Sequence, residues 1–236
     1  MTDLAGVVLK AAEGYEYSAA PQRTPAWYDL RIGKVTASRL EDFLAVSKAK
    51  NSAGKKLKKR TDYELELLYE RQFKVAYNNY VTEAMMDGIQ LEEFALAQAE
   101  KLMNIKMVPV GAWYNDKFVA SPDGAIDEDG LAEAKVLRDN SFSELLTKGF
   151  EGSLNKYWKQ MQGQLRASGR KYVLFVAINL NTKKIYIIRV ERDEEFMEWL
   201  DLNLEEELTA EIENFDTGNL HDFVDEAPDI KEEMGF

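Results

Sequence analysis

Asp123, Glu133 and Lys135 lie on the two arms of a predicted hairpin, and their side-chain types suit hydrolysis of a phosphodiester. Residues 121–137 read SPDGAIDEDGLAEAKVL, in which two apolar runs flank a turn rich in Asp and Gly, a pattern typical of a β-hairpin. Side chains two apart in a strand share a face, so we expect Glu133 and Lys135 to point the same way and Asp123 to face them. Two carboxylates and an ammonium are costly to bury unless a divalent cation lies between the acids.

Mg²⁺ suits this group of side chains, because it binds oxygen ligands and keeps several waters of its own. Such an ion lowers the pKa of a bound water and stabilises charge on a phosphoryl oxygen, while Lys135 could steer the attacking water or neutralise the phosphorane. Pro122-Asp123, nine residues and then Glu133-x-Lys135 resembles the PD-(D/E)xK nuclease signature. The alternative is an exposed hairpin with solvated charges, because short patterns readily match by chance.

The segment RTPAWYDLRIGKVTASRL, residues 23–40, is a candidate phosphate site. Thr36 or Ser38 can cap a helix that runs through Leu40 and Phe43. A helix N-terminus with a hydroxyl, just after Arg31, favours binding of a phosphate. The alternative is an ordinary capped helix with Arg31 in a surface ion pair.

Two predicted helices could add polar groups to the hairpin site. Glu92 or Glu93, in the helical segment GIQLEEFA, could supply a third acidic ligand. Gln160 and Gln164 lie one helical turn apart, and their amides could hydrogen-bond a metal-bound water or a phosphate. Taken singly, each of these residues is better explained by a solvated helix surface.

The formal net charge of −12 is unevenly distributed along the chain. Residues 191–236 contain 18 acidic residues against two basic ones, which leaves residues 1–190 with a net charge of +4. The acidic total therefore does not exclude DNA, because the field near a site depends on where the charges lie. Seven cations concentrate in residues 48–60, which predicts a mobile basic loop able to follow a phosphate backbone: Lys48, Lys50, Lys55, Lys56, Lys58, Lys59 and Arg60.

Composition excludes several classes of site. The chain has no cysteine and a single histidine, His221 in the acidic tail, so disulfides, Cys-ligated metals and Ser-His-Asp hydrolysis are not expected. No apolar run is long enough for a membrane span, and the N-terminus lacks the apolar stretch of a signal peptide. We expect a cytoplasmic protein.

The apolar pattern predicts helices before and after a mixed sheet, hence an α/β or α+β class. A capping box at Thr61-Asp62-Tyr63-Glu64 predicts a helix start, and Asp193 is expected to cap a long helix through Leu208. The expected helices and strands are the helix from Thr82 to about Met103, the strands near 107–114 and 117–121, and the strands Tyr172–Ile178 and Lys184–Val190.

Taken together and in this order, the motifs resemble the lambda-exonuclease family, also described as YqaJ-like viral recombinases. The resemblance covers roughly residues 23–215, and it leaves an N-terminal extension at 1–22 and an acidic tail at 216–236. The matching segments are W-x-x-L-R-x-G-x-x-T-A-S at Trp27–Ser38, G-x-x-x-E at Gly88–Glu92, S-P-D-G at Ser121–Gly124, E-x-K at Glu133–Lys135 and Y-x-x-Q-x-Q at Tyr157–Gln162.

This resemblance implies a central mixed sheet flanked by helices, with a restriction-endonuclease-like core, and it implies a role for each matching residue. Asp123, Glu133 and the backbone carbonyl of Ala134 match metal ligands. Lys135 matches the catalytic lysine. The remaining matches are Glu92 as an acidic residue near or in the metal shell, Gln160 as an active-site glutamine, and Arg31 and Ser38, with Thr36 beside them, as the pocket for the 5′-phosphate.

The implied activity is Mg²⁺-dependent digestion, with Mn²⁺ able to substitute, of the 5′-ended strand of linear duplex DNA, which leaves 3′ overhangs. The resemblance also implies a phage or prophage protein in a bacterial host, a ring-shaped homotrimer and a single-strand annealing protein as partner. Two alternatives stay open: an endonuclease on the same core, of the restriction or junction-resolving type, and a non-catalytic DNA-end-binding or annealing protein.

Overall fold

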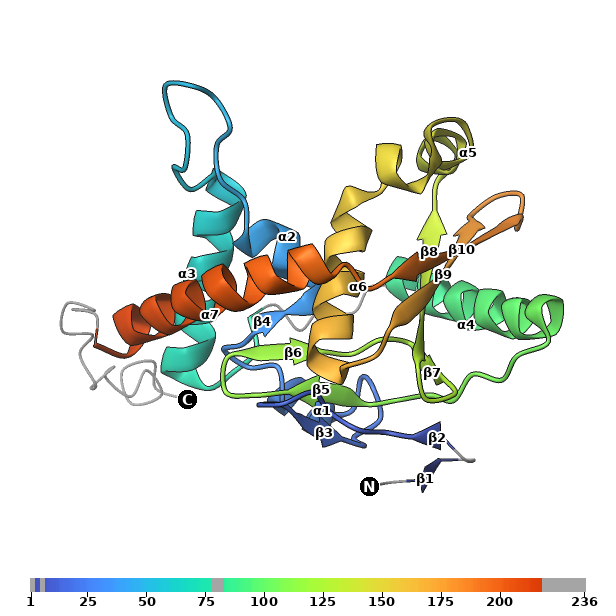
Figure 1. The fold of residues 1–236 in the computed structure, drawn as a ribbon, viewed down its shortest axis with the longest axis horizontal. Helices are drawn as coiled ribbons and strands as arrows, with labels where there is room; N and C mark the ends of the chain where they lie inside the picture. Colours follow the sequence, from blue (N-terminus) through green and yellow to red (C-terminus); the bar gives the residue numbers. More distant parts are fainter. Residues whose placement is uncertain (1–2, 5–6, 78–82, 218–236) are drawn as a thin grey trace, which may run out of the picture.

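The computed structural model describes residues 3–4, 7–77 and 83–217, which form two four-stranded mixed sheets with helices packed between and around them (Figure 1). The expected α/β class, with mixed sheets flanked by helices, is confirmed. A short ribbon of β1 (Asp3–Leu4) and β2 (Val7–Val8) precedes the sheets. None of the helices in the described ranges combines the length and apolarity needed to span a bilayer.

The first sheet contains the predicted hairpin and has the order β10-β9-β8-β7. The hairpin pairs β7 and β8 antiparallel, as expected, while β8 and β9 run parallel because two helices connect them. The predicted strands near 172–178 and 184–190 are confirmed as the antiparallel pair β9 and β10. The strands are β7 (Gly124–Ile126), β8 (Gly130–Leu137), β9 (Tyr172–Asn179) and β10 (Ile185–Glu191).

The second sheet has the order β3-β5-β6-β4. Its first strand lies within residues 1–22, so the fold includes part of that segment. The strand expected over 107–114 is shorter than predicted, because Pro109 cannot donate to a ladder and Gly111 passes close to the Ser18 carbonyl; only an isolated bridge from Val108 to Ala125 precedes it. The strands are β3 (Glu16–Ser18), β4 (Val35–Thr36), β5 (Ala112–Tyr114) and β6 (Phe118–Ala120).

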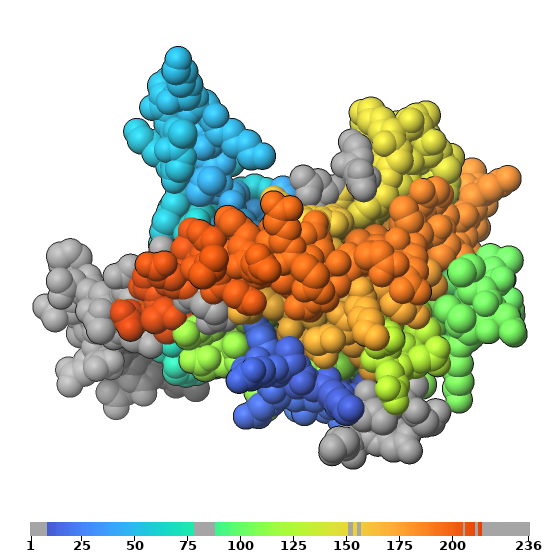
Figure 2. All heavy atoms as spheres, viewed as in Figure 1, coloured from blue at the N-terminus to red at the C-terminus, as the bar shows by residue number. Residues whose placement is uncertain are grey.

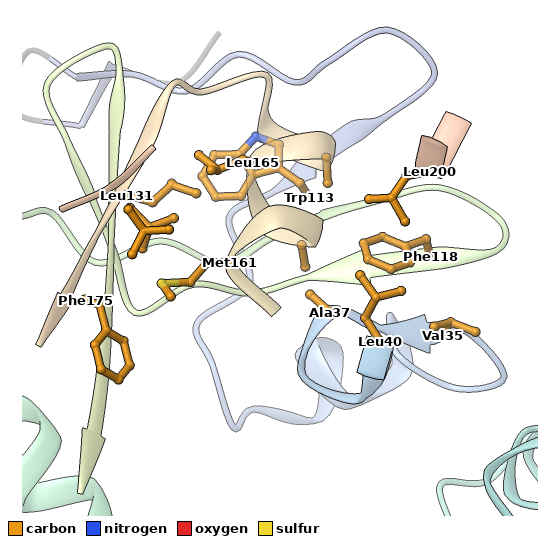
Figure 3. Packing of buried hydrophobic residues seen from close by; sticks show 14 of the residues in the cluster. Val35, Ala37, Leu40, Trp113, Phe118, Leu131, Met161, Leu165, Phe175 and Leu200 are labelled. Atoms are coloured by element: carbon orange, nitrogen blue, oxygen red, sulfur yellow. The ribbon is translucent and has the colours of Figure 1, made fainter. Parts of the chain in front are cut away.

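Helix α6 (Asn155–Ser168) lies between the two sheets and forms the centre of the core. Its Met161 and Leu165 are fully buried, and Figure 3 shows them between Leu131 and Phe175 of the first sheet and Trp113 of the second. Gly163 permits this close packing, since a Cβ there would lie 3.0 Å from the Phe118 ring. The opposite face of the first sheet packs on α4 (Glu83–Met103).

Two predicted helix starts are wrong. The helix expected from the Thr61 capping box begins earlier, as α3 (Lys58–Phe73), because Glu64 pairs with Arg60 and Lys56 and is not available to close the box. The helix expected after Thr36 is only a 3₁₀ turn, η1 (Ala37–Arg39), and one turn of α2 (Leu40–Phe43), and neither Thr36 nor Ser38 caps it.

The other predicted helices are present. Asp193 accepts from the Phe196 N–H and caps α7 (Glu194–Thr217), as expected. The predicted helix through Met103 is α4, whereas its expected first residue, Thr82, lies outside the described residues, as does nearly all of the acidic tail. Two further helices are α1 (Pro25–Asp29) and α5 (Asp139–Ser153), the latter interrupted at Gly149 with φ of 72°.

The basic segment between α2 and α3 forms a projection closed by a bridge between Val46 and Lys56. Figure 2 shows this projection in blue and α5 in yellow rising from the same side of the molecule, with a hollow between them. Only part of its charge is available to a ligand, because Lys56, Lys58, Lys59 and Arg60 pair with acids of the chain. Among the described residues, no ion pair is found for Lys48, Lys50 or Lys55.

Candidate active site

The hairpin brings Asp123 against β8, as the sequence predicted. The Asp123 N–H donates to the Ala132 carbonyl at 3.0 Å, and the Ala134 N–H donates to Oδ2 of Asp123 at 2.7 Å. The side chain of Asp123 therefore continues the hydrogen-bond ladder one step past the start of β7. Its carboxylate is fixed at the edge of the strand that carries Glu133.

Glu92 occupies the next position along the same edge. The Val136 N–H acts on its carboxylate and lowers its pKa slightly against the larger effect of burial, and Glu92 lines the same cavity as Asp123. In a strand, the N–H and C=O of one residue point to the same side, and neighbouring residues alternate. The carbonyl of Ala134 therefore faces the edge where Asp123 and Glu92 lie, whereas Glu133 and Lys135 direct their backbone groups toward β9. Glu92, which alone could be a surface residue, is thus part of the site.

The Glu133 side chain extends from the other side of this group and is almost completely buried, with 2% of its surface exposed. Three donors surround its carboxylate. Oε1 accepts from Lys135 Nζ at 2.5 Å and from Gln160 Nε2 at 2.5 Å, and Oε2 accepts from Gln164 Nε2 at 2.6 Å. Glu133, Lys135 and Gln160 are thus brought together, and the hairpin is not a solvated surface feature.

Gln164 is a residue that sequence reasoning left undecided. Taken singly it was better explained by helix surface, yet it is 1% exposed and contacts the central carboxylate. The only sequence signal was its spacing of four from Gln160, which places both amides on one face of α6. That spacing indicates a shared neighbour without identifying it.

The charged side chains of the site shift one another's pKa values. Burial and the nearby Glu133 raise the pKa of Asp123 to about 7, although Lys135 and the Ala134 N–H oppose the shift. Burial also raises the pKa of Glu92, with Glu133 adding to it and Lys135 opposing it. For Lys135, burial alone would lower the pKa, but the charge of Glu133, helped by Asp123 and Glu92, raises it well above its usual range. Lys135 is therefore a permanent cation.

The oxygen atoms at this edge fit a hard divalent cation. Raised pKa values on Asp123 and Glu92 report acids that lack enough nearby positive charge, and the Ala134 carbonyl supplies a neutral oxygen beside them. Among the described residues, no group of three acidic side chains is placed to hold a metal ion, and both oxygens of Glu133 are occupied by donors. Mg²⁺ needs few protein ligands, so the donor set fits it.

The candidate phosphate residues lie on the segment before α2. The Arg31 guanidinium stacks over the Trp27 ring, 4.2 Å from its centroid, and Trp27 Nε1 donates to Ser121 Oγ at 3.0 Å. This bond links the segment to the SPDG turn of the hairpin, a connection that sequence reasoning missed. Among the described residues, no hydrogen bond or ion pair is found for the Arg31 guanidinium.

Thr36 and Ser38 share a hydrogen bond between their hydroxyl groups at 3.1 Å. The Thr36 N–H donates to the buried Tyr63 hydroxyl at 3.0 Å, and the charge of Arg31 acts on the same hydroxyl. Tyr63 therefore places Arg31 and Thr36 in one neighbourhood. No hydrogen bond joins Arg31 to either hydroxyl in the described part of the chain.

Two cavities reach this group of residues. Asp123 and Glu92 line a cavity of about 590 Å³ between α4 and the segments before β5. Gln160 and Ser38 line a second cavity of about 360 Å³, together with Tyr157 and Lys59. Asp123, Glu92 and Ser38 are therefore open to ligands, whereas Arg31 and Thr36 line neither cavity and Glu133 is buried.

Comparison with known proteins gives three results. Residues 26–171 match the sequence model of the YqaJ-like viral recombinase domain. No curated protein sequence matches the chain significantly. The structure is similar to an alkaline exonuclease (LHK-Exo) from Laribacter hongkongensis, with a TM-score of 0.64 at 28% identity over 82% of this chain and 93% of that one.

A second structure of LHK-Exo, in complex with dAMP, gives a TM-score of 0.65 at 26% identity, and the match covers 90% of this chain and 98% of that one. A phage-related exonuclease from Haemophilus somnus 129PT has the same fold, with a TM-score of 0.62 at 17% identity over 78% and 94% of the two chains.

Proposed function

Because the chain belongs to the YqaJ-like viral recombinase family, we propose that it is a Mg²⁺-dependent exonuclease that digests the 5′-ended strand of linear duplex DNA. The products would be 3′ overhangs for recombination by strand annealing. The observation that carries the proposal is the group formed by Asp123, Glu133 and Lys135 at one strand edge, with Glu92 beside it. The similarity to LHK-Exo, an alkaline exonuclease, supports the same activity.

Lys135 would stabilise negative charge on the phosphoryl group that is attacked. The charges of Glu133, Asp123 and Glu92 raise its pKa and favour the protonated form in the cation-free site, which supports a role as a cation. Oε1 of Glu133 accepts a hydrogen bond from Lys135 Nζ at 2.5 Å and so holds the ammonium group in position. Because the Lys135 ammonium is already in place, the site does not have to reorganise when negative charge develops in the transition state.

Asp123, Glu92 and the Ala134 carbonyl would hold the divalent cation, with Glu133 joining them by exchanging one donor. The bound ion would supply an activated water and would stabilise charge on the phosphoryl oxygen. Its charge would also favour the ionised form of Asp123, whose pKa of about 7 leaves it partly protonated without a cation.

Arg31, with Thr36 and Ser38, would bind the terminal 5′-phosphate. The Arg31 guanidinium lies over the Trp27 ring, and its N–H groups are suited to bidentate contact with phosphate. The Trp27–Ser121 hydrogen bond would hold this anchor at a constant distance from the hairpin. A terminal anchor beside the scissile bond favours digestion from an end over internal cutting.

By family resemblance we further propose a ring-shaped homotrimer around DNA, a single-strand annealing protein as partner, and a phage or prophage origin in the cytoplasm of a bacterial host. Lys48, Lys50 and Lys55 of the projecting segment are then placed to contact the duplex backbone. The trimer is testable by mass measurement in solution.

The decisive experiment compares linear duplexes that carry or lack a 5′-phosphate with covalently closed circles, in Mg²⁺ and in chelator. We expect Mg²⁺-dependent loss of the 5′-ended strand, faster with the phosphate, and intact circles. Cutting of closed circles would instead identify an endonuclease on this core. Binding of DNA ends without any hydrolysis in Mg²⁺ would leave only a DNA-end-binding or annealing role.

A further inference from the structure

Gln164 is buried at the centre of the molecule with half of its amide unpartnered. Its Nε2 donates to Oε2 of Glu133 at 2.6 Å, but its Oε1 has no hydrogen-bond partner within the described residues. An unsatisfied buried carbonyl destabilises the fold, whereas a hydrophobic residue at this position would avoid that cost. The side chain therefore needs an explanation beyond packing.

The orientation of the Gln164 amide is determined by Glu133. Turning the amide over would place its carbonyl oxygen against a carboxylate oxygen, with no proton between them. In the observed orientation, Nε2 of Gln164 donates to Glu133, and Oε1 of Gln164 has no partner among the described residues.

The two oxygens of Glu133 are held differently. Oε1 has two donors, Lys135 and Gln160, whereas Gln164 is the one donor to Oε2 found in the described part of the chain. Gln160 lines the cavity that contains Ser38, while Gln164 is 1% exposed and does not reach solvent. Gln164 therefore acts on the carboxylate from the closed side of the site.

We propose that Gln164 is a positioning residue that anchors Oε2 of Glu133 and so fixes the orientation in which this carboxylate meets a divalent cation. The inference rests on the proposed function, in which Glu133 joins the cation's ligands. Because the carboxylate is already held in one orientation, it loses less rotational freedom when the cation binds. Groups that orient metal ligands in this way typically change metal affinity about 10–100-fold.

The test is cation binding by Gln164→Met, a substitution of similar length that lacks the amide. Titration calorimetry with Mn²⁺ alone, without DNA, should show affinity reduced by about 10-fold or more. In nuclease assays the Mg²⁺ concentration for half-maximal rate should rise by a similar factor. The KM for DNA should be unchanged, and saturating Mg²⁺ should restore most of kcat.

Gln162→Met is the matched control. Gln162 is also fully buried on α6, but its amide joins the Glu191 carbonyl at 2.9 Å and the Asp193 N–H at 3.0 Å, away from Glu133. Losing both bonds should lower Tm and leave Mn²⁺ affinity at the wild-type value. A merely structural role for Gln164 would make the two variants alike.

Wild-type Mn²⁺ affinity in Gln164→Met, or an equal loss in both variants, would overturn the inference, as would a wild-type protein that binds no Mn²⁺. Should Gln164→Met not fold, Gln164→Asn, whose amide is one methylene short of Oε2, should lose affinity in the same direction, and wild-type affinity there would overturn the inference as well. A wild type that binds Mn²⁺ without digesting DNA, with the Gln164 effect intact, would remove the nuclease proposal and keep this one.

Discussion

The Ala134 N–H donates to the carboxylate of Asp123 across the open end of the hairpin, over 2.7 Å. The Asp123 carboxylate thereby accepts the hydrogen bond that a backbone carbonyl would accept if the paired strand continued. In the described part of the chain, no backbone pairs with the edge of β8 beyond that point, and the Val136 N–H there acts on the Glu92 carboxylate. The ends of the two hairpin arms therefore form an edge that can bind a ligand. Main-chain N–H groups of β8 face the acidic side chains at that edge.

Lys135→Ala should slow hydrolysis strongly and leave DNA binding nearly unchanged. Loss of one preorganised charge at a developing anion typically lowers the rate about 10²–10³-fold. Single-turnover digestion of linear duplex measures the rate, and a mobility shift in Ca²⁺ measures binding. Lys171→Ala, which removes an exposed lysine paired with Asp129, should behave as wild type. Full activity in Lys135→Ala would remove this residue from the mechanism.

Asp123→Asn should stabilise the cation-free protein at alkaline pH. Because the pKa of Asp123 is about 7 in the fold and near 4 when unfolded, its contribution to stability is fully present below pH 4 and is lost as the pH rises through 7. The difference amounts to about 2–4 kcal/mol at pH 8 after allowance for solvent screening. Thermal unfolding in chelator at pH 4 and pH 8 measures it.

The control for this prediction is Glu128→Gln, which neutralises an exposed acid in the turn of the same hairpin. It should change Tm little at either pH. Adding Mg²⁺ at pH 8 should raise the Tm of wild type and of Glu128→Gln, but not that of Asp123→Asn. An Asp123→Asn variant no more stable than wild type at pH 8 would contradict the charge repulsion inferred at this edge.

Replacing Lys48, Lys50 and Lys55 together by Ala should weaken binding to duplex DNA and reduce its dependence on salt. Each DNA phosphate that a lysine no longer neutralises reduces the slope of log K against log salt by about 0.9, so the slope of the triple variant should be smaller by up to about 2.7. Fluorescence anisotropy in Ca²⁺ over a salt series measures the slope. Lys58→Ala removes a lysine already paired with Asp62 and should leave the slope unchanged. An unchanged slope in the triple variant would exclude this segment from the DNA interface.

Arg31→Ala should remove the preference for a 5′-phosphorylated end. A charge-assisted hydrogen bond contributes about 1.5–3 kcal/mol, which corresponds to about 10–100-fold in the ratio of rates on 5′-phosphate and 5′-hydroxyl duplexes. Arg31→Lys keeps the charge but loses the planar stack on Trp27, so it should recover only part of the ratio. Arg39→Ala is the control, because Arg39 is already paired with Asp42 and Glu66. A phosphate preference that survives Arg31→Ala would place the anchor elsewhere.

Much of the local structure was predictable from short-range patterns. The turn and alternation at 121–137 predicted the hairpin, and Asp193 followed by Phe196 and Leu200 predicted the capped helix α7. The capping box at Thr61 failed because Glu64 pairs instead with Arg60, one turn earlier on the same helix. Local propensity is a weak prior that such contacts override.

The sequence by itself determined which groups are available and which of them share a strand or a helix face: Glu133 with Lys135, and Gln160 with Gln164. Only the tertiary structure decided that these two pairs meet, that Glu92 reaches the edge of β8, and that Trp27 bonds to Ser121. The partners are separated by tens of residues, and their meeting depends on how α4 and α6 pack on opposite faces of one sheet. Periodicity shows that a helix has a buried face, but it does not show which carboxylate that face will cover.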